Sequence, residues 1–401
     1  MFFSVAIKYS LVSFIQFAIK KLNFFFVGLF CLLTPVKKNK IVFSSFEGAW
    51  LGCNPKYILK ELLKQNLPFE IVWLKNKETP KNIEFKDKIK YVDYKNKLAV
   101  LKELASAKIW IDNTLKTDLF KLGLIKKENQ FYINTWHGSL GIKKLFYDTD
   151  NYSPSDEYKE LLKKEFDYCD LMISNCDWEE NVYKSAMKYS NEIKKLGHPR
   201  NDIFFEDSKE YKNKICKEFN IDSSQKLAIY MPTYRNSLSN IYYDLDFAKL
   251  KKTLEEKFKG NWTILVRSHN FNLKKNIFKN QEVYDVSFYP DSQELLAASD
   301  ILISDYSSCM FDFALAKKPC FVYAKDIEEY NIERGLYYSF NKTPFLVAKN
   351  NDELTQNIAN FDEYEYQKKC NNFLNEREVL EDGKASYRIV ELLKSIMGYE
   401  I

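Results

Sequence analysis

The histidines of this chain lie in short strings whose other side chains can bind anions or turn the backbone sharply. There are only three, in NTWHGSLGIKK (His137), GHPRND (His198) and VRSHN (His269). Histidine changes its charge nearest to neutral pH, so these strings are the first candidates for proton transfer or for contact with an anionic substrate.

The string around His137 combines a titratable ring with two glycines and two lysines. Gly138 and Gly141 allow a substrate to approach the backbone closely. Lys143 and Lys144 can neutralise phosphate. We therefore expect His137 to be a catalytic general base, with Gly138 and both lysines in contact with the substrate. A structural histidine with satisfied hydrogen bonds is the alternative.

Arg267 and His269 end an expected strand two residues apart, so their side chains share one face of it. A guanidinium and an imidazole on the same side could bind a phosphoryl oxygen and orient or protonate a leaving group. The alternative is an arginine paired with a core carboxylate and a histidine that donates to a carbonyl. We take His269 as the second catalytic candidate and Arg267 as a substrate-binding candidate.

The string ILISDYSSCMFDFALAKKP places an apolar strand before a polar loop and a helix that should begin near Cys309. Hydroxyl groups and free backbone N–H groups at such a point form an anion site, for which a diphosphate is the obvious ligand. Ordinary N-capping by serine is the alternative. Arg235 follows another expected strand in YMPTYR and could meet the same diphosphate, or form a surface ion pair. The candidate substrate-binding residues of these two strings are Arg235, Ser304, Asp305, Ser307 and Ser308.

The string GHPRND is typical of an architectural element. Pro199 and Asn201 suit a turn, and Asp202 suits a helix cap. Arg200 could fasten these parts together. His198 therefore ranks below the other two histidines.

Composition excludes several classes of protein. Among 401 residues, 60 basic and 55 acidic side chains give a formal net charge of +5, which argues against a nucleic-acid-binding surface. Eight scattered cysteines without a CxxC pair fit a reduced, cytosolic environment. No two histidines have metal-ligand spacing, and there is no GKS/T or GxGxxG string, so we expect no metal ion and no cofactor.

From Lys40 onward, short β-rich runs alternate with helical spacing, which is typical of a parallel, doubly wound α/β sheet. The pattern restarts after a charged stretch at 207–220. We expect two Rossmann-like domains, 39–215 and 216–401 with the terminal helices, that face each other across a ligand-binding cleft. The expected strands are 41–46, 69–74, 107–113, 130–136, 171–175, 226–233, 262–269, 283–287, 301–308 and 319–324, with helices at 56–65 and 96–106.

Two apolar runs open the chain, at 9–19 and 22–36, with lysines between and after them. Neither reaches the roughly 20 apolar residues that a spanning helix needs. We expect residues 1–38 to form a helical segment that associates with a membrane surface, as a hairpin or an in-plane helix. A cleavable signal peptide, a buried helical hairpin and an oligomer contact are the alternatives.

Read together, TWHGSLGIKK, GHPRND, YMPTYR, RSH and SDYSSCMFDFALAKKPCFVYAKDIEEYNIERG resemble the CDP-glycerol glycerophosphotransferase family of teichoic-acid and capsule polymerases. The resemblance implies a GT-B-like fold and peripheral attachment to the cytoplasmic face of the cell membrane. It also implies that polyol phosphate, with glycerol as the expected polyol, moves from a CDP-activated donor to a hydroxyl of a polymer or lipid-linked acceptor, with release of CMP.

By the same resemblance, His137 and His269 match the catalytic histidines of the family, and the donor-side positions match Arg235, Arg267, Ser307 and Ser308. Arg334, near the end of the last string, is a further substrate-binding candidate. Asn236 and the segment LYYSFNKTPF depart from the family pattern and leave the polyol and the acceptor open. A sugar-transferring GT-B enzyme and a non-catalytic membrane-bound assembly protein are the rival functions. The oligomeric state also stays open.

Overall fold

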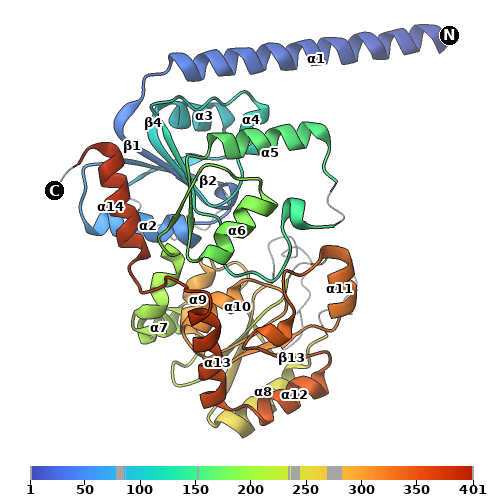
Figure 1. Ribbon diagram of the computed structural model, residues 1–401, viewed down its shortest axis with the longest axis vertical. Helices are drawn as coiled ribbons and strands as arrows, with labels where there is room; N and C mark the ends of the chain where they lie inside the picture. Colours follow the sequence, from blue (N-terminus) through green and yellow to red (C-terminus); the bar gives the residue numbers. More distant parts are fainter. Residues whose placement is uncertain are drawn as a thin grey trace.

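The computed structural model describes residues 2–77, 85, 87–150, 153–233, 235, 244–268 and 282–399, with side chains from Ala18 onward. The chain folds into two layered α/β domains, one above the other in Figure 1. Each domain has a parallel sheet with helices on both of its faces.

The N-terminal sheet has seven parallel strands in the order β3-β2-β1-β4-β5-β6-β7. Its strands are β1 (Lys37–Ser44), β2 (Glu70–Lys75), β3 (Lys90–Asp93), β4 (Ala107–Asp112), β5 (Phe131–Asn134), β6 (Leu171–Ser174) and β7 (Glu192–Lys195). Val42 of β1 pairs with Val72 on one side and with Trp110 on the other. Burial on both faces explains why the central strands are nearly continuous apolar runs.

The C-terminal sheet has six parallel strands in the order β10-β9-β8-β11-β12-β13. Its strands are β8 (Lys226–Met231), β9 (Trp262–Val266), β10 (Tyr284–Asp285), β11 (Ile301–Ser304), β12 (Cys320–Tyr323) and β13 (Leu346–Ala348). In both sheets the strand order reverses beside the first strand, between β1 and β4 or between β8 and β11. The loops that follow these neighbouring strands run in opposite directions, which leaves room for a ligand at the carboxyl ends of the strands.

The helices that cover the sheets are α2 (Cys53–Lys64), α3 (Lys97–Ser106), α4 (Thr117–Lys121), α5 (Asp156–Tyr168), α6 (Asp177–Ala186), α7 (Ser208–Glu218), α8 (Phe247–Phe258), α9 (Ser292–Ala298), α10 (Cys309–Leu315), α11 (Ile327–Arg334), α12 (Asn351–Ala359), α13 (Glu363–Asn375) and α14 (Ala385–Met397). The short 3-10 helices η1 (Phe46–Gly48), η2 (Phe146–Asp148), η3 (Pro199–Phe205) and η6 (Phe340–Lys342) connect them.

The prediction of an α/β fold with parallel sheets is confirmed, and every expected strand overlaps an observed one. Three strands went unrecognised, β3, β7 and β13, and each lies at the edge of its sheet. Edge strands are half exposed, so they lack the continuous apolar run that identifies central strands. β7, with the sequence EIKK, has no fully buried residue.

The chain crosses between the domains at α7 and returns at α14. Tyr211 and Ile215 of α7 belong to the core of the C-terminal sheet, beside α9. α14 crosses back and packs against α2, with Ile389 and Leu393 in the core of the N-terminal sheet. The expected boundaries 1–38, 39–215 and 216–401 stay predictions.

The N-terminal segment is one helix, α1 (Phe2–Leu33), the second of the two expected forms, because the helix continues through Lys20 and Lys21. Its C-terminal end packs on α3 with Cys31 buried, whereas its N-terminal part projects beyond the body of the molecule. Within the described residues, no helix is long and apolar enough to cross a membrane.

Candidate functional site

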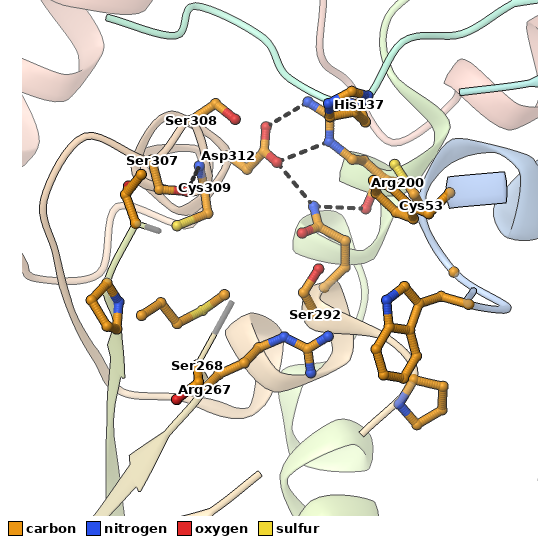
Figure 2. A pocket seen from close by; sticks show the side chains of 18 of the residues that line it. Cys53, His137, Arg200, Arg267, Ser268, Ser292, Ser307, Ser308, Cys309 and Asp312 are labelled. Carbon is orange, nitrogen blue, oxygen red and sulfur yellow. Dashed lines mark hydrogen bonds and ion pairs between the residues drawn. The ribbon is translucent and has the colours of Figure 1, made fainter. Parts of the chain in front are cut away.

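A cavity of about 270 Å³ lies between the two domains, at the carboxyl ends of their strands. The N-terminal domain lines it with Phe46, Trp50, Gly52, Cys53, His137, Lys143 and Arg200. The C-terminal domain lines it with Met231, Pro232, Thr233, Arg267, Ser268, Pro290, Ser292, Gln293, Ser307, Ser308, Cys309 and Asp312. Figure 2 shows most of these side chains around one open space.

His137 is held in the wall of this cavity by its own loop. The turn after β5 is fixed by the backbone N–H of Thr135, which donates to the carbonyl of Asp112 at 2.7 Å. The imidazole lies 4.4 Å from the Trp136 ring and 5.4 Å from the Phe46 ring, centroid to centroid. Nδ1 is 2.7 Å from the carbonyl oxygen of Asn113.

The surroundings of His137 determine its protonation state. A carbonyl oxygen can only accept, so Nδ1 carries the proton and donates it to Asn113. Burial lowers the pKa of His137 to about 4, because the charged ring would lose its hydration. At neutral pH the imidazole is therefore uncharged with Nε2 free to accept a proton, which is the state that a general base requires.

Arg267 lies on the opposite side of the open space, directly after β9 (Figure 2). Its Nη1 donates to the carbonyl of Tyr289 at 2.6 Å, and the guanidinium lies 5.7 Å from the Trp50 ring. Burial lowers the pKa of Arg267 to about 10, which still leaves it charged at neutral pH. It forms no ion pair with a carboxylate of the described residues, so the alternative of a core salt bridge is not observed.

Ser307 and Ser308 lie in the loop between β11 and α10, and α10 begins at Cys309 as predicted. Ser308 occupies the N-cap position, but its hydroxyl makes no capping hydrogen bond. Both serines line the cavity. Ordinary capping therefore does not account for Ser308, whose hydroxyl is available to a ligand.

Arg200 lines the cavity, although its sequence string predicted a purely structural role. Its Nε and Nη2 form a two-point ion pair with Asp312 of α10, at 2.9 and 3.0 Å, and only 2% of its surface is exposed. Its third nitrogen, Nη1, has no hydrogen-bond partner within the described part of the chain. A buried guanidinium N–H without an acceptor is costly, so this nitrogen is poised for a ligand.

The charge balance of the cavity favours an anion. Among the described residues, its lining contains three cations, Lys143, Arg200 and Arg267, and a single carboxylate, Asp312, which is already paired with Arg200. The indole Nε1 of Trp50 is a second buried donor without an acceptor among the described residues. The cavity thus offers positive charge and donors and needs a ligand rich in acceptor oxygens.

Several predicted site residues lie outside the cavity. Arg235 is 8% exposed, and its Nε and Nη2 pair with Asp326 at 2.6 and 3.0 Å, while Nη2 also donates to Asp305 at 3.0 Å. Asp305 in turn accepts from the backbone N–H groups of Thr233 and Tyr306. This cluster joins the loops after β8 and β11. Arg235 and Asp305 therefore hold these two loops in position and do not line the cavity.

The remaining predicted site residues also do not line the cavity or lie outside the described residues. The Ser304 hydroxyl donates to the carbonyl of Met231, inside the sheet. Lys144 forms an exposed ion pair with Asp150 at 3.2 Å, and Arg334 is exposed at the end of α11. Gly138 lines a smaller neighbouring pocket. His269 lies outside the described residues, so its catalytic role stays a prediction.

His198 is architectural in its contacts, in agreement with its lower rank. It is fully buried, and its Nε2 lies 2.9 Å from the carboxylate of Glu179. Asp202 of the same string does cap a helix, but a distant one. It accepts from the backbone N–H groups of Ala385 and Ser386 at the start of α14.

The cavity thus unites His137, Lys143, Arg267, Ser307 and Ser308 of the predicted set and adds Arg200, Asp312 and Trp50. The only sequence signal for Arg200 was its place in a compact string, and that string also suited a turn. That Nη1 is left without a partner follows only from the packing of α10 against η3, which pairs Asp312 with the other two nitrogens.

Comparison with known proteins identifies the family. Residues 26–395 match the family described as CDP-Glycerol:Poly(glycerophosphate) glycerophosphotransferase. The chain belongs to this family. The predicted resemblance is therefore confirmed, and with it the prediction of a glycerophosphotransferase-type enzyme.

Members of the family resemble this chain over nearly its whole length. A teichoic acid poly(glycerol phosphate) polymerase of Bacillus spizizenii is 29% identical, over 90% of this chain and 93% of its own. A teichoic acid glycerol-phosphate transferase of Staphylococcus aureus is 30% identical, over 89% and 93%. A solved structure of the wall teichoic acid polymerase TagF, a histidine variant soaked with CDPG, has a TM-score of 0.76 at 30% identity and 90% coverage of each chain. This likeness confirms the GT-B-like arrangement.

Proposed function

We propose that the protein transfers glycerol phosphate from CDP-glycerol to a hydroxyl group of a teichoic-acid-type polymer or a lipid-linked acceptor, with release of CMP. The observation that carries the proposal is the interdomain cavity, in which an uncharged imidazole faces a cation-rich wall with unpartnered donors. Membership of the family and the CDPG soaked into TagF support the choice of donor.

The transfer is a single displacement at the β-phosphorus of the donor. Nε2 of His137 takes the proton of the acceptor hydroxyl as its oxygen bonds to that phosphorus. The bond between the β-phosphorus and the bridging oxygen breaks, and CMP leaves with the electron pair. Arg200, Arg267 and the hydroxyls of Ser307 and Ser308 stabilise the charge on the phosphoryl oxygens. Side chains alone perform these steps, so the proposal needs no metal ion and no cofactor.

His269 would act with Arg267 on the leaving phosphate, because it follows Arg267 by two residues in the sequence. Arg235 and Asp305 would act on the donor indirectly, by holding the loops after β8 and β11.

The proposal places the enzyme on the cytoplasmic face of the cell membrane, attached through α1. Phe25, Phe26 and Leu33 on this helix are 62%, 56% and 72% exposed. A groove of about 1010 Å³ beside it is lined by apolar side chains and by Lys20, Lys97, Lys102 and Lys121. Apolar rings flanked by lysines suit the headgroup region of an anionic bilayer, with α1 in its plane.

The deciding experiment incubates the purified protein with a soluble oligo(glycerol phosphate) acceptor and, in turn, CDP-glycerol, CDP-ribitol and a nucleotide sugar. We expect release of CMP with CDP-glycerol and lengthening of the acceptor by glycerol phosphate. His137→Asn should lower the rate by on the order of 10² to 10⁴. Release of a nucleoside diphosphate from the sugar donor would favour the glycosyltransferase. Absence of turnover with every donor would favour the assembly protein.

A further inference from the structure

A second, smaller pocket of about 120 Å³ adjoins the cavity at His137. We call it the aromatic pocket. It is lined by Trp136, His137, Gly138, Leu140, Gly141, Lys143, Leu145, Trp178, Glu179, Val182, Tyr183, Ser308 and Tyr337. It shares His137, Lys143 and Ser308 with the cavity, and most of its other walls come from the N-terminal domain.

The walls of the aromatic pocket include four tryptophan and tyrosine rings, and the hydroxyls of two of them, Tyr183 and Tyr337, already have hydrogen-bond partners. Trp178 packs edge to face on Tyr337, with ring centroids 5.6 Å apart at 90°. The hydroxyl of Tyr337 donates to Asp148 at 2.7 Å and accepts from the backbone N–H of Leu145 at 3.2 Å. These bonds fix the ring and leave its apolar face to the pocket.

The one carboxylate of the aromatic pocket is also occupied. Glu179 accepts from the hydroxyl of Tyr183 at 2.7 Å, from Nε2 of His198 and from the backbone N–H of Asn175. Of the described residues that line it, Lys143 is the only lysine or arginine, and it also lines the cavity. The pocket therefore presents apolar rings at its far end and positive charge only at the junction.

Two glycines border the junction, next to Ser308 at the N-cap of α10. A Cβ atom on Gly138 would lie 3.0 Å from Oγ of Ser308, and one on Gly141 would lie 3.5 Å from Cβ of Ser308. Side chains at these positions would narrow the passage between the cavity and the aromatic pocket. The glycines thus keep both compartments in reach of the same imidazole.

We propose that the aromatic pocket binds the terminal polyol unit of the acceptor and directs its hydroxyl group to Nε2 of His137. This inference rests on the proposed function, because it assigns the second substrate of the same reaction. A general base must contact the acceptor hydroxyl while the donor phosphorus lies beside it, and only a compartment that shares His137 with the cavity meets this condition. The rings pack against the C–H faces of a short carbon chain, and the small volume selects a single polyol unit over a nucleotide.

The test uses two variants in the aromatic pocket and one in the cavity. Trp178→Ala removes a wall, and Val182→Phe fills the space from α6; neither residue lines the cavity. Trp50→Phe is the matched control, because Trp50 lines only the cavity. Initial rates of CMP release are measured with either CDP-glycerol or soluble oligo(glycerol phosphate) varied, and CDP-glycerol hydrolysis is measured without an acceptor.

Both pocket variants should raise the KM for the oligomer at least about tenfold, with the KM for CDP-glycerol and the hydrolysis rate unchanged. Trp50→Phe should raise the KM for CDP-glycerol instead. An unchanged KM for the oligomer in both pocket variants, or a raised KM for CDP-glycerol in them, would overturn the inference.

A binding measurement separates failure of the inference from failure of the proposed function. The oligomer is titrated into wild-type and variant protein by calorimetry, without any donor, and melting curves confirm that each variant is folded. If Val182→Phe does not fold, Trp178→Phe takes its place, because the smaller phenylalanine ring removes part of the pocket wall and adds no volume. Binding to the wild type that is lost in the pocket variants supports the inference even if no donor turns over. Equal binding in all variants contradicts it even if CMP release is normal.

Discussion

At the scale of single residues, the site depends on which polar atoms the fold leaves without partners. The sequence identified His137, Arg267 and Ser308, and the structure brings them to one cavity. It also places two arginines differently from the sequence prediction, which put Arg235 at the substrate and gave Arg200 an architectural role. Arg235 is tied to Asp305 and Asp326, whereas Arg200 keeps one nitrogen for a ligand.

The pH dependence of the reaction should report the environment of His137. Its pKa is lowered to about 4, so the basic form persists far below the ordinary pKa of histidine. We expect kcat/KM to stay level from pH 8 to about pH 5 and to fall below that. A bound diphosphate favours the charged ring, so the acid limb of kcat should lie at higher pH than that of kcat/KM. Initial rates from pH 4.5 to 8 test this, and a kcat/KM limb near 6.5 would contradict it.

Arg200→Lys should weaken donor binding, because lysine cannot pair with Asp312 at two points and also present Nη1 to the cavity. Loss of a charged hydrogen bond predicts a decrease in kcat/KM for CDP-glycerol of about 10- to 100-fold. Arg235→Lys is the matched control and should lower the melting temperature with a smaller effect on kcat/KM. The opposite ranking would return Arg235 to the donor site.

At the scale of elements, burial determines what the sequence reveals. Strands buried on both faces, such as β4 and β11, were recognised, and edge strands such as β7 were not. The start of α10 was also predicted, because a polar loop separates it from an apolar strand. For α1 the sequence left a hairpin and a single helix open, since Lys20 and Lys21 are equally compatible with a turn, and the structure has the single helix.

Polar substitutions on α1 should abolish vesicle binding without unfolding the protein. Phe25, Phe26 and Leu29 are 62%, 56% and 40% exposed, so their replacement by glutamine removes little buried surface. We expect the triple variant to float with anionic vesicles far less than the wild type, at an unchanged melting temperature.

A triple variant of exposed apolar residues elsewhere, Phe205→Gln, Ile332→Gln and Tyr364→Gln, is the control for α1 and should float normally. Equal flotation of the two triple variants would argue against attachment through α1.

At the scale of the whole molecule, buried ion pairs hold the two domains together around the cavity. Lys56 of α2 pairs with Asp291 at 3.0 Å and with Glu294 at 2.7 Å. All three side chains are less than 5% exposed. Burial by itself would raise the pKa of Glu294, but Lys56 and further donors lower it to about 2. The charged cluster is therefore part of the folded state at neutral pH.

Lys56→Met should destabilise the protein strongly, because it leaves two carboxylates buried beside each other. Removal of one partner from a buried pair costs about 3–5 kcal/mol. Lys37→Met is the control, since Lys37 is 56% exposed beside Glu70 and its loss should change the stability far less than the loss of Lys56. Urea denaturation of both variants compares them, and similar midpoints would contradict a role for the interdomain cluster.

The sequence by itself determined the family, the two parallel α/β sheets and the strings that supply the chemistry, because strand periodicity and local motifs are properties of adjacent residues. Only the tertiary structure decided which members of those strings face the same cavity. Partners such as Arg200 and Asp312, or Asp202 and Ser386, lie more than 100 residues apart. Whether a charged group is neutralised or left for a ligand depends on these distant contacts, and no local pattern records them.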